Sequence, residues 1–536
     1  MRIEGVIGHP ERGLRPFEAG LRPFEKWPAA KGLSALQPER MNTRLDHAIR
    51  IVALFTAALA VVGAAECFLV PGMLAARDVG DPAMGGPGIP ERARELHRSL
   101  SERIGPWARE RIASGEATRV PLYDVPQTEW PIFTCVFYLN ATQQLADQGI
   151  DVRYARESVE AARDLIMDPG HHTWVRTHWG DDYLHDENVF FRSLLISGLT
   201  SYEVLTQSGR DLEFLRDQVE TLAGDLDRSP HGVLQDYPQE TYPIDVLAAI
   251  AWIARADRVL GTDHSAFVAR ARRAFVAPYD DALGLPRFRV DLRGAAMPQN
   301  VQPGRGIGTS WILIFAPELW PEDADRWYAV HETEFWQELD WATGFREYAR
   351  DGLEGEWTYD VDSGPVLDGF GTAASAFGVG AARRNGRFDH AYTLSAQMST
   401  SSWPWLDGSM LLPQEFSHPC APMLGEAAIA YFLTIQPAEH ATIVQGGHLT
   451  PLVFFGFAVY FGAFAFVVLI ALLAARRIRR SEPARAPVRV GVWAFLSACG
   501  VLVSFADPFV GLACLLVALV FFPKRARPVP LPLPPR

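Results

Sequence analysis

Residues 234–261 read LQDYPQETYPIDVLAAIAWIARADRVLG, a carboxylate-rich loop that leads into a helical pattern. Its second half predicts a helix over 246–260, because apolar residues recur there at helical spacing: Leu247, Ile250, Ala251, Ala254 and Leu260. Pro243 suits the first turn of that helix, where a missing N–H leaves nothing unpaired, and Gly261 suits its C-terminal end. A buried helix is therefore expected here.

The first half of the same stretch places three carboxylates and two tyrosines before the helix: Asp236, Tyr237, Glu240, Tyr242 and Asp245. A helix N-terminus favours negative charge and offers free N–H groups. Carboxylates held close together raise one pKa, so that one group donates a proton while another accepts it. We predict catalytic roles for Asp236, Glu240 and Asp245 and a substrate contact for Tyr242. In the alternative, Asp245 only caps its helix and Asp236 only makes a turn.

Helical patterns recur along the whole middle of the chain. Apolar-periodic runs cover 92–114, 130–147, 152–167, 187–206, 211–226, 244–260, 264–276, 307–316, 322–341, 366–385, 387–399 and 421–434. The runs form pairs with short turns inside a pair and longer loops between pairs. This pattern predicts an all-α (α/α)6 toroid, flanked by transmembrane helices.

Two long apolar regions bracket that block, and a third follows them. The expected division is a disordered cytoplasmic N-terminus (1–47), a transmembrane helix (48–75), an extracytoplasmic domain (76–450), a second transmembrane helix (451–475), a basic cytoplasmic loop (476–490), a transmembrane hairpin broken at Asp507-Pro508 (491–523) and a proline-rich cytoplasmic tail (524–536). Arginines before the first span, after the second and after the hairpin place both termini in the cytoplasm. The prediction is an integral membrane protein with four spans. A cleaved signal in place of the first span, a re-entrant loop in place of the hairpin, and a true start at Met41 stay open.

Charge and cysteine content limit the classes of function that are expected for the chain. The formal net charge is −13, with no basic domain, so a nucleic-acid partner is not expected. Of five cysteines, only Cys135 and Cys420 lie in the extracytoplasmic block, either as one disulfide or as two free thiols. No zinc pattern, GxSxG, HExxH or P-loop is present, so acid–base chemistry by carboxylates is what remains. A metal site in the loop 168–186 stays an alternative.

Three further loops are rich in acids and aromatics, as loops that carry function often are. Loop 168–186 offers Asp182 as an acid–base group with His178 and Trp179 against the substrate. Loop 342–368 offers Glu356 and Asp362 as catalytic carboxylates, with Trp357 and Tyr359 as substrate contacts. Loop 400–420 offers the substrate contacts Trp405, Asp407 and His418. Turn formation, helix capping and lid packing are the alternatives in these loops.

Several framework segments resemble the linalool dehydratase/isomerase family: DENVFFRSLL (186–195), GLTSYEVLT (198–206), DRVLGTD (257–263), GFGTAASAF (369–377) and ARRNG (382–386). The resemblance covers roughly residues 129–435. It implies an (α/α)6 barrel that acts on a small alcohol, with carboxylates, tyrosine, histidine and cysteine and without a metal or organic cofactor. Leu194 stands where the family has a histidine, and the loop before residue 244 has no cysteine.

The expected function is therefore a membrane-anchored enzyme, resembling this family, with cofactor-free acid–base chemistry at a C–O bond. Dehydration, hydration or isomerisation of an alcohol, such as a terpenoid, fits this chemistry. The first alternative is a glycoside hydrolase or polysaccharide lyase acting on a surface or lipid-linked glycan, because toroids host such enzymes too. The second is a toroid that binds a ligand without catalysis, which the absent histidine and cysteines favour. The expected partners are the small-molecule substrate and the lipid bilayer.

Overall fold

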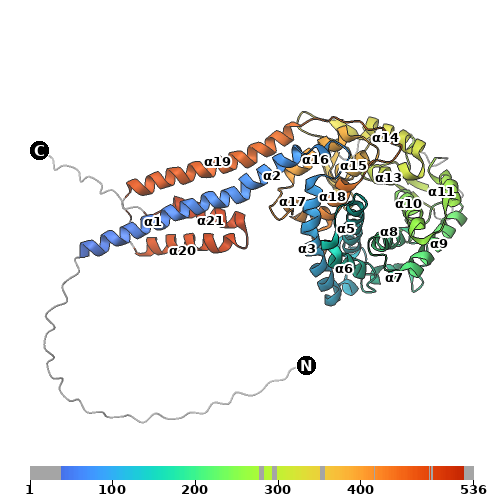
Figure 1. Ribbon diagram of the computed structural model, residues 1–536, viewed down its shortest axis with the longest axis horizontal. Coiled ribbons are helices and arrows are strands. Elements are labelled where there is room, and N and C mark those ends of the chain that lie inside the picture. The colour runs from blue at the N-terminus through green and yellow to red at the C-terminus, as the bar shows by residue number, and fades with distance from the viewer. Residues whose placement is uncertain are drawn as a thin grey trace, which may run out of the picture.

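The computed structural model describes residues 38–276, 283–292, 299–350, 357–415, 417–481, 483 and 487–523. These residues form a predominantly helical protein, with a narrow bundle of apolar helices at one end and a larger helical domain at the other (Figure 1). The predominantly helical character predicted from the sequence is confirmed. Residues 1–37 of the predicted N-terminal region and the whole tail, 524–536, lie outside the described residues.

The apolar bundle is built from both ends of the chain. It contains α1 (Pro38–Ala64), the π-helical turn η1 (Ala65–Leu69), α2 (Val70–Val79), α19 (Pro451–Arg480), α20 (Pro487–Ser504) and α21 (Pro508–Val520). Three described helices are long and apolar enough to cross a membrane, namely Thr43–Val79, α19 and α20. The 13-residue α21 is shorter than the roughly 20 residues that a span needs, and it packs against α20 and α1. Membrane association is therefore indicated by length and composition.

Two predicted boundaries of the bundle differ from those in the structure. The first helix begins at Pro38, so residues 38–47 are helical rather than disordered. At the other side, α19 runs on to Arg480 and α20 starts at Pro487, which shortens the predicted basic loop. Hydropathy marks where apolar side chains stop, whereas a helix continues as long as its backbone hydrogen bonds do. The predicted break at Asp507-Pro508 is present, because the Asp507 carboxylate caps α21.

The domain is organised around helices that contact one another in a closed cycle. Its members in order are α5 (Trp130–Asp147), α8 (Val189–Thr206), α10 (Pro243–Leu260), α13 (Gly306–Leu319), α15 (Thr372–Arg384) and α18 (Leu424–Thr434), and α18 returns to α5. Helix α13 is buried along most of its length, as expected of a helix that is apolar on every side. We call this arrangement the helix cycle.

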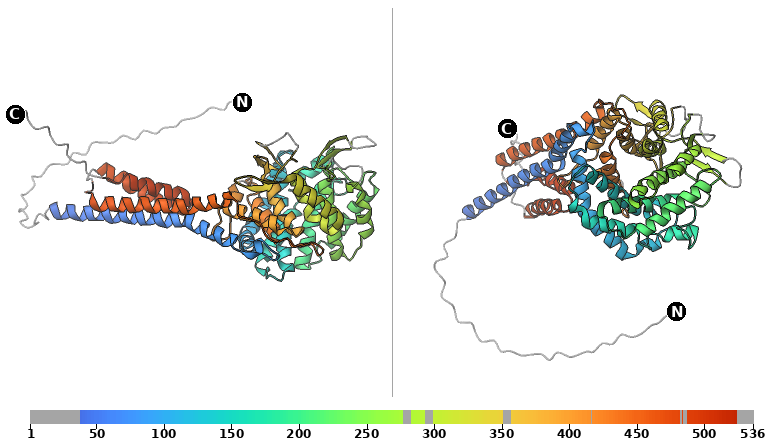
Figure 2. Two further views of the ribbon diagram at one scale, coloured as in Figure 1. Left: turned by 90° about the horizontal axis from the view of Figure 1, so that it is seen from above. Right: turned by 45° about the vertical axis from the view of Figure 1, so that its right-hand side comes forward.

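A second set of helices lies outside the cycle (Figures 1 and 2). Helix α3 (Glu91–Ser114) packs on α6 (Arg156–Ile166) and α18. Helix α9 (Leu212–Arg228) packs on α8 and α10. Helix α14 (Pro321–Phe335) packs on α13, and α16 (Phe388–Ser401) packs on α15. Helix α6 is amphipathic, with one buried face and one charged face. The short helices are η2 (Pro82–Met84), η3 (Glu116–Arg119), α4 (Val125–Thr128), η4 (Arg153–Ala155), α7 (Thr173–Trp179), α11 (Ser265–Ala271), α12 (Arg273–Val276) and α17 (Leu411–Glu415).

Short antiparallel strands stand in loops that the sequence predicts as irregular or helical. They are β1 (Arg289–Asp291) with β2 (Gln299–Gln302), β3 (Trp336–Glu338) with β4 (Thr343–Phe345), and the series β5 (Trp357–Asp360), β6 (Gly364–Leu367) and β7 (Phe370–Gly371). The predicted helices 322–341 and 366–385 are wrong at these positions. Strands this short have too few residues for a period of two to be distinguished from a helical pattern.

The segments before the cycle helices come together at one end of the cycle. The Val189 amide at the start of α8 donates to the carbonyl of Gln235, in the loop before α10. The Gly306 amide at the start of α13 donates to the Glu347 carbonyl, and the Glu347 amide donates to Gly369 just before α15. We call this the N-terminal end of the cycle. Because backbone N–H groups at helix starts lack partners in their own helix, this end suits anionic groups.

The domain is docked directly on the apolar bundle. The Trp403 indole N–H donates to the Cys67 carbonyl at 2.8 Å, inside the π-helical turn η1. The Trp403 ring also packs on Tyr460 of α19, with ring centroids 4.5 Å apart. The Tyr460 hydroxyl donates to the Thr400 carbonyl at 2.9 Å, at the end of α16. Loop 402–410 therefore joins the domain to helices from both ends of the chain.

Candidate active site

The N-terminus of α10 is held by a local carboxylate. Tyr242 precedes the helix in an extended conformation, Pro243 opens it, and Gly261 ends it in the left-handed conformation, as predicted. The Asp236 carboxylate accepts a hydrogen bond from the Tyr242 amide at 2.6 Å. The tight turn that brings Asp236 to this amide is closed by the Glu240 amide, which donates to the Tyr237 carbonyl at 2.9 Å.

Asp236 is a buried carboxylate with an open hydrogen-bonding position. Its residue exposure is 1%. Burial raises its pKa well above the usual range, and the nearby charge of Asp245 raises the pKa further. Its Oδ1 atom has no hydrogen-bond partner of good geometry among the described residues, although the Phe190 backbone N–H is near enough to lower the pKa of this carboxyl. A buried polar atom without a partner is rare, so this oxygen distinguishes Asp236 from an ordinary structural carboxylate.

Glu129 forms the second buried group of the site. It stands between α4 and α5, is 6% exposed, and accepts a hydrogen bond from the Tyr237 hydroxyl at 2.5 Å. Burial raises the pKa of Glu129 to about 8, although the hydrogen bond from Tyr237 opposes the rise. A carboxyl group with this pKa is mostly protonated at neutral pH and can act as an acid.

Asp245 and Asp362 bring a third and a fourth carboxylate to the same region. Burial raises the pKa of Asp245, the Asp362 charge adds to the rise, and a hydrogen bond from Trp311 of α13 opposes it. Asp362 is exposed in the turn between β5 and β6. Its charge also raises the pKa values of Glu129 and Tyr242. The structure thus gathers Asp236, Asp245 and Asp362 with Glu129 at the N-terminal end of the cycle, and we call these four residues the carboxylate cluster.

Glu240 and Tyr242 lie at the solvent side of this cluster. The Tyr242 hydroxyl donates to Glu240 at 3.0 Å, and Arg289 of β1 forms a 2.9 Å ion pair with the same carboxylate. The Arg289 guanidinium also lies over the Tyr242 ring, 5.7 Å from its centroid. Burial and the Glu240 charge raise the pKa of Tyr242. Glu240 is therefore compensated by an arginine, whereas no cation among the described residues forms an ion pair with Asp236.

Aromatic rings line the inner side of the carboxylate cluster. Phe133 of α5 meets Phe190 of α8 and Trp311 of α13, each with ring centroids 6.0 Å apart. Phe190 and Trp174 lie beside Tyr237, at 6.4 and 6.3 Å. Polar groups that can exchange protons thus face an apolar aromatic surround, which is the usual composition of a small-molecule site.

The residues predicted in loop 168–186 lie beside the site or away from it. His178 packs edge-on against Trp174, which contacts Tyr237, so it is one ring removed from the carboxylate cluster. Trp179 ends α7 beside it. The Asp182 side chain is 83% exposed and bonds His185 at 3.0 Å on the surface. Asp182 therefore does not join the carboxylate cluster.

The residues predicted in loops 342–368 and 400–420 lie in different parts of the structure. Trp357 and Tyr359 are 70% and 69% exposed on β5, next to the turn that carries Asp362. Trp405 packs against Phe509 of α21, and Asp407 accepts hydrogen bonds from Ser409 within its own turn. His418 accepts from the Cys420 amide at 3.2 Å. Glu356 lies outside the described residues.

The sequence patterns do not single out Glu129 and Trp311. A local signal exists for Glu129, because it is an acidic residue at the start of a helix, immediately before Trp130-Pro131. Trp311 gives no such signal, because one more aromatic residue in an apolar helix is expected to be core. Only the tertiary contact with Asp245 distinguishes it.

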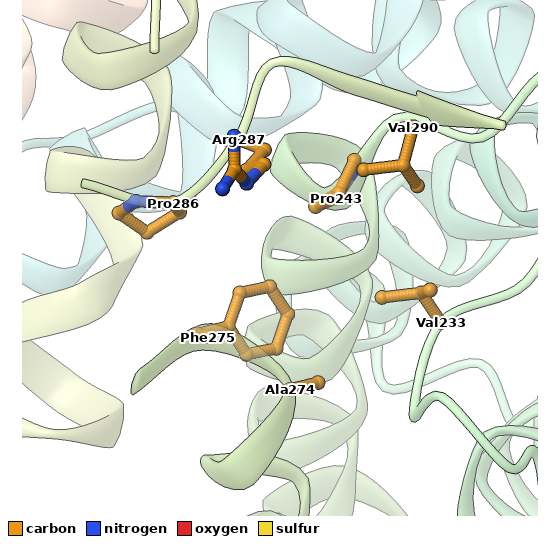
Figure 3. A pocket seen from close by; sticks show the side chains of 7 residues that line it. All are labelled: Val233, Pro243, Ala274, Phe275, Pro286, Arg287 and Val290. Carbon is orange, nitrogen blue, oxygen red and sulfur yellow. The ribbon is translucent and has the colours of Figure 1, made fainter. Parts of the chain in front are cut away.

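The small pocket in Figure 3 lies beside the start of α10. It has a volume of about 10 Å³ and is lined by Val233, Pro243, Ala274, Phe275, Pro286, Arg287 and Val290. A space of this size holds about one water molecule. This pocket is therefore not the place for an organic substrate.

Neither a metal site nor a disulfide is found among the described residues. No group of three or more histidine, cysteine, aspartate or glutamate side chains within them is placed to hold a metal ion. Cys135 is buried in α5 and Cys420 is partly exposed, and both are free thiols. Comparison of the chain with models of protein families and with curated proteins gives no match.

Proposed function

We propose that the domain is an (α/α)6 toroid of the kind found in the linalool dehydratase/isomerase family. The closed helix cycle and the outer helices that accompany it support this proposal. So does the gathering of long loops at one end. The family resemblance of residues 129–435 adds an expectation about chemistry, which is cofactor-free acid–base catalysis on an alcohol.

The proposed activity is dehydration, hydration or isomerisation of a small apolar alcohol. The observation that carries it is the pairing of Glu129 with Tyr237 beside the buried Asp236, at the edge of an aromatic surround. Chemistry at a C–O bond needs an acid to protonate the leaving hydroxyl and a base to remove a proton from the neighbouring carbon. Carboxyl groups in different environments within one site can supply both.

Glu129 is assigned as the acid and Asp245 as the base. At neutral pH the Glu129 carboxyl group keeps its proton, donates it to the substrate hydroxyl, and water leaves as the C–O bond breaks. The Asp245 carboxylate stands in the first turn of α10, where the helix dipole favours negative charge, and it removes a proton from the adjacent carbon as the double bond forms. The reverse sequence hydrates an alkene, and hydration at a different carbon isomerises the alcohol.

The aromatic rings around the carboxylate cluster favour an apolar substrate. Positive charge develops on carbon as the C–O bond breaks, and the faces of Phe133, Phe190 and Trp311 can stabilise it. The apolar helices suit a substrate that partitions into lipid. The proposed placement is an integral membrane protein with four spans, both termini in the cytoplasm and the domain outside it.

A glycoside hydrolase or polysaccharide lyase is the second proposal, and one specific observation favours it. Trp357 and Tyr359 present exposed rings on the same face of β5, beside Asp362. Flat exposed aromatic rings can stack on sugars, and a pair of carboxylates can cleave a glycosidic bond. The buried, apolar surroundings of Glu129 and Asp236 favour the alcohol instead.

The deciding experiment uses the full-length protein in lipid nanodiscs, incubated with terpenoid alcohols in one arm and oligosaccharides, including lipid-linked glycans, in the other. Mass spectrometry follows the products. We expect an alcohol to lose or gain water. Released sugars would replace this proposal with the glycosidase, and a folded protein without products in both arms would favour a binding function.

Variants connect such activity to the carboxylate cluster. Glu129→Gln and Asp245→Asn are each expected to lower turnover about 10²–10⁴-fold, as loss of a general acid or base does, without loss of helical circular dichroism. Asp182→Asn is the matched control, because its exposed side chain lies away from the cluster, and it should keep full activity. Full activity of Glu129→Gln would remove Glu129 from the mechanism.

A further inference from the structure

A cavity of about 480 Å³ lies at the end of the helix cycle opposite the carboxylate cluster. It is lined by residues near the C-terminal ends of α5, α10, α13 and α15 and by the segment 436–440. A volume of several hundred Å³ is the usual size of a small-molecule site. Nothing in the proposed chemistry of the carboxylate cluster uses this cavity.

Two arginines and one glutamate form an ion-pair trio in the cavity wall. Arg255 Nε donates to Glu318 Oε1 at 2.7 Å, and Arg384 Nη2 donates to Glu318 Oε2 at 2.9 Å. The three side chains are 12%, 19% and 19% exposed. Arg255 is also fixed by ring contacts, 4.3 Å above Trp252 and 5.1 Å from Phe315. The trio is therefore rigid and partly desolvated before any ligand arrives.

The trio carries one more positive charge than negative charge. Arg384 makes only a long 3.4 Å contact to the Gln436 carbonyl besides its bond to Glu318. Its Nε atom is buried and has no hydrogen-bond partner among the described residues. The Nη1 atom, which has only the long contact among the described residues, is therefore the donor of Arg384 that can bind an oxyanion in the cavity.

The remaining lining is mixed, with three prolines and Ala438 among the polar side chains. Gln144 and Gln148 contribute amides that can bond hydroxyl groups, whereas the amides of Asn140, Gln143 and Gln436 already bond other parts of the protein. Asp147, Arg258, Glu439 and His440 are exposed at the rim, where solvent screens their charges. The ion-pair trio, which carries the excess positive charge, thus lies in the most buried part of the cavity wall.

Helix ends explain part of this arrangement but not all of it. Arg258 and Arg384 stand in the last turns of α10 and α15, where a cation offsets the negative end of the helix dipole. That role needs a positive charge near the helix end. It requires neither an open volume of this size nor polar amides around it.

We propose that this cavity binds a small carboxylate- or phosphate-bearing molecule, with its oxyanion on Arg384 beside Arg255 and its polar groups on the amides. The inference is independent of the chemistry proposed for the carboxylate cluster. The arginines in the cavity wall favour an oxyanion. The experiment distinguishes a carboxylate from a phosphate.

The test is isothermal titration calorimetry of the full-length protein in non-ionic detergent with inorganic phosphate in one arm and citrate in the other, and glycerol as the neutral control. We expect at least one anion to bind and glycerol not to. Arg384→Gln should weaken binding by about tenfold or more, because a charge-assisted contact is lost. Glu318→Gln should tighten binding, because the competing carboxylate is gone.

The opposite signs for the two variants separate a binding site from a structural ion pair. Arg228→Gln is the matched control, since it removes one positive charge from an exposed side chain at the end of α9, outside the cavity lining, and should leave binding unchanged. If Arg384→Gln does not fold, Arg258→Gln at the exposed rim replaces it and should weaken binding to a smaller extent. Absence of binding by both anions, or equal loss in Arg228→Gln, would overturn the proposal.

Discussion

At the scale of single residues, the protonation of the site is set by burial. Glu129 and Asp236 are nearly inaccessible to water, and their carboxyl groups have raised pKa values for that reason before any neighbour is considered. Neighbouring carboxylates add to the effect and the hydrogen bond from Tyr237 reduces it. The site can therefore hold a proton at neutral pH, which an exposed glutamate cannot do.

The pH dependence of activity should follow Glu129. If its protonated form is the acid, kcat/KM falls as pH rises through about 8, where the proton is lost. Tyr237→Phe removes a hydrogen bond that lowers the pKa of Glu129, so the alkaline limb should move to higher pH. The measurement is a pH–rate profile of both proteins in full-length form.

A matched control is Tyr183→Phe, because Tyr183 bonds His172 and not a site carboxylate, and its alkaline limb should stay in place. A limb that moves to lower pH in Tyr237→Phe would contradict the assignment of Glu129 as the acid.

At the scale of elements, α10 links the site to the opposite end of the cycle. Its first turn carries Asp245, its interior is almost fully buried, and its later turns carry Arg255 and Arg258. The helix therefore has a fixed start and a fixed end. Pro243 sets the start, and Gly261 sets the end with φ at 65°.

Gly261→Ala should destabilise the protein by about 1 kcal/mol, because a left-handed conformation costs a residue with a Cβ atom roughly this much. No heavy atom lies within 4 Å of the added Cβ, so conformational strain is the whole cost. Gly261→Asn is the control and should lose less, since asparagine tolerates this conformation. Thermal unfolding of the detergent-solubilised protein measures both, and equal stability of all three proteins would contradict the strain argument.

At the scale of the whole molecule, the domain and the apolar bundle share one interface. The π-helical turn η1 interrupts the regular bonding of the first long helix, and its Cys67 carbonyl is satisfied by Trp403 from the domain. Arg92 of α3 pairs with Asp78 of α2 at 2.6 Å, both nearly inaccessible to water. These contacts join the domain to the end of the helical bundle (Figure 2).

Trp403→Phe should loosen this interface while keeping an aromatic ring against Tyr460. The Cys67 carbonyl loses the indole donor, so we expect a loss of about 1 kcal/mol and faster hydrogen exchange across residues 65–71. Trp405→Phe is the control, because its ring packs on Phe509 and a phenyl ring can keep that contact. Unchanged exchange in Trp403→Phe would show that the indole hydrogen bond does not hold η1.

Much of the fold follows from local patterns. The helix predicted over 130–147 coincides with α5, and Pro243 and Gly261 bound α10 as expected, because capping and periodicity are properties of neighbouring residues. The short strands do not follow, since their pairing depends on residues that meet only after the helices pack. The closed order of contacts is likewise a property of the assembled helices.

For the candidate site, the residue pattern predicts which loops contribute carboxylates, and it places Asp236 and Asp245 on either side of a helix start. Tertiary structure alone decided which acids meet. It joined Glu129 to Tyr237 across 108 positions, buried Glu129, left Asp182 on the surface and placed Trp405 against Phe509 of α21. The physical reason is that a pKa depends on burial and on charges that are near in space, and neither quantity is encoded in the spacing along the chain.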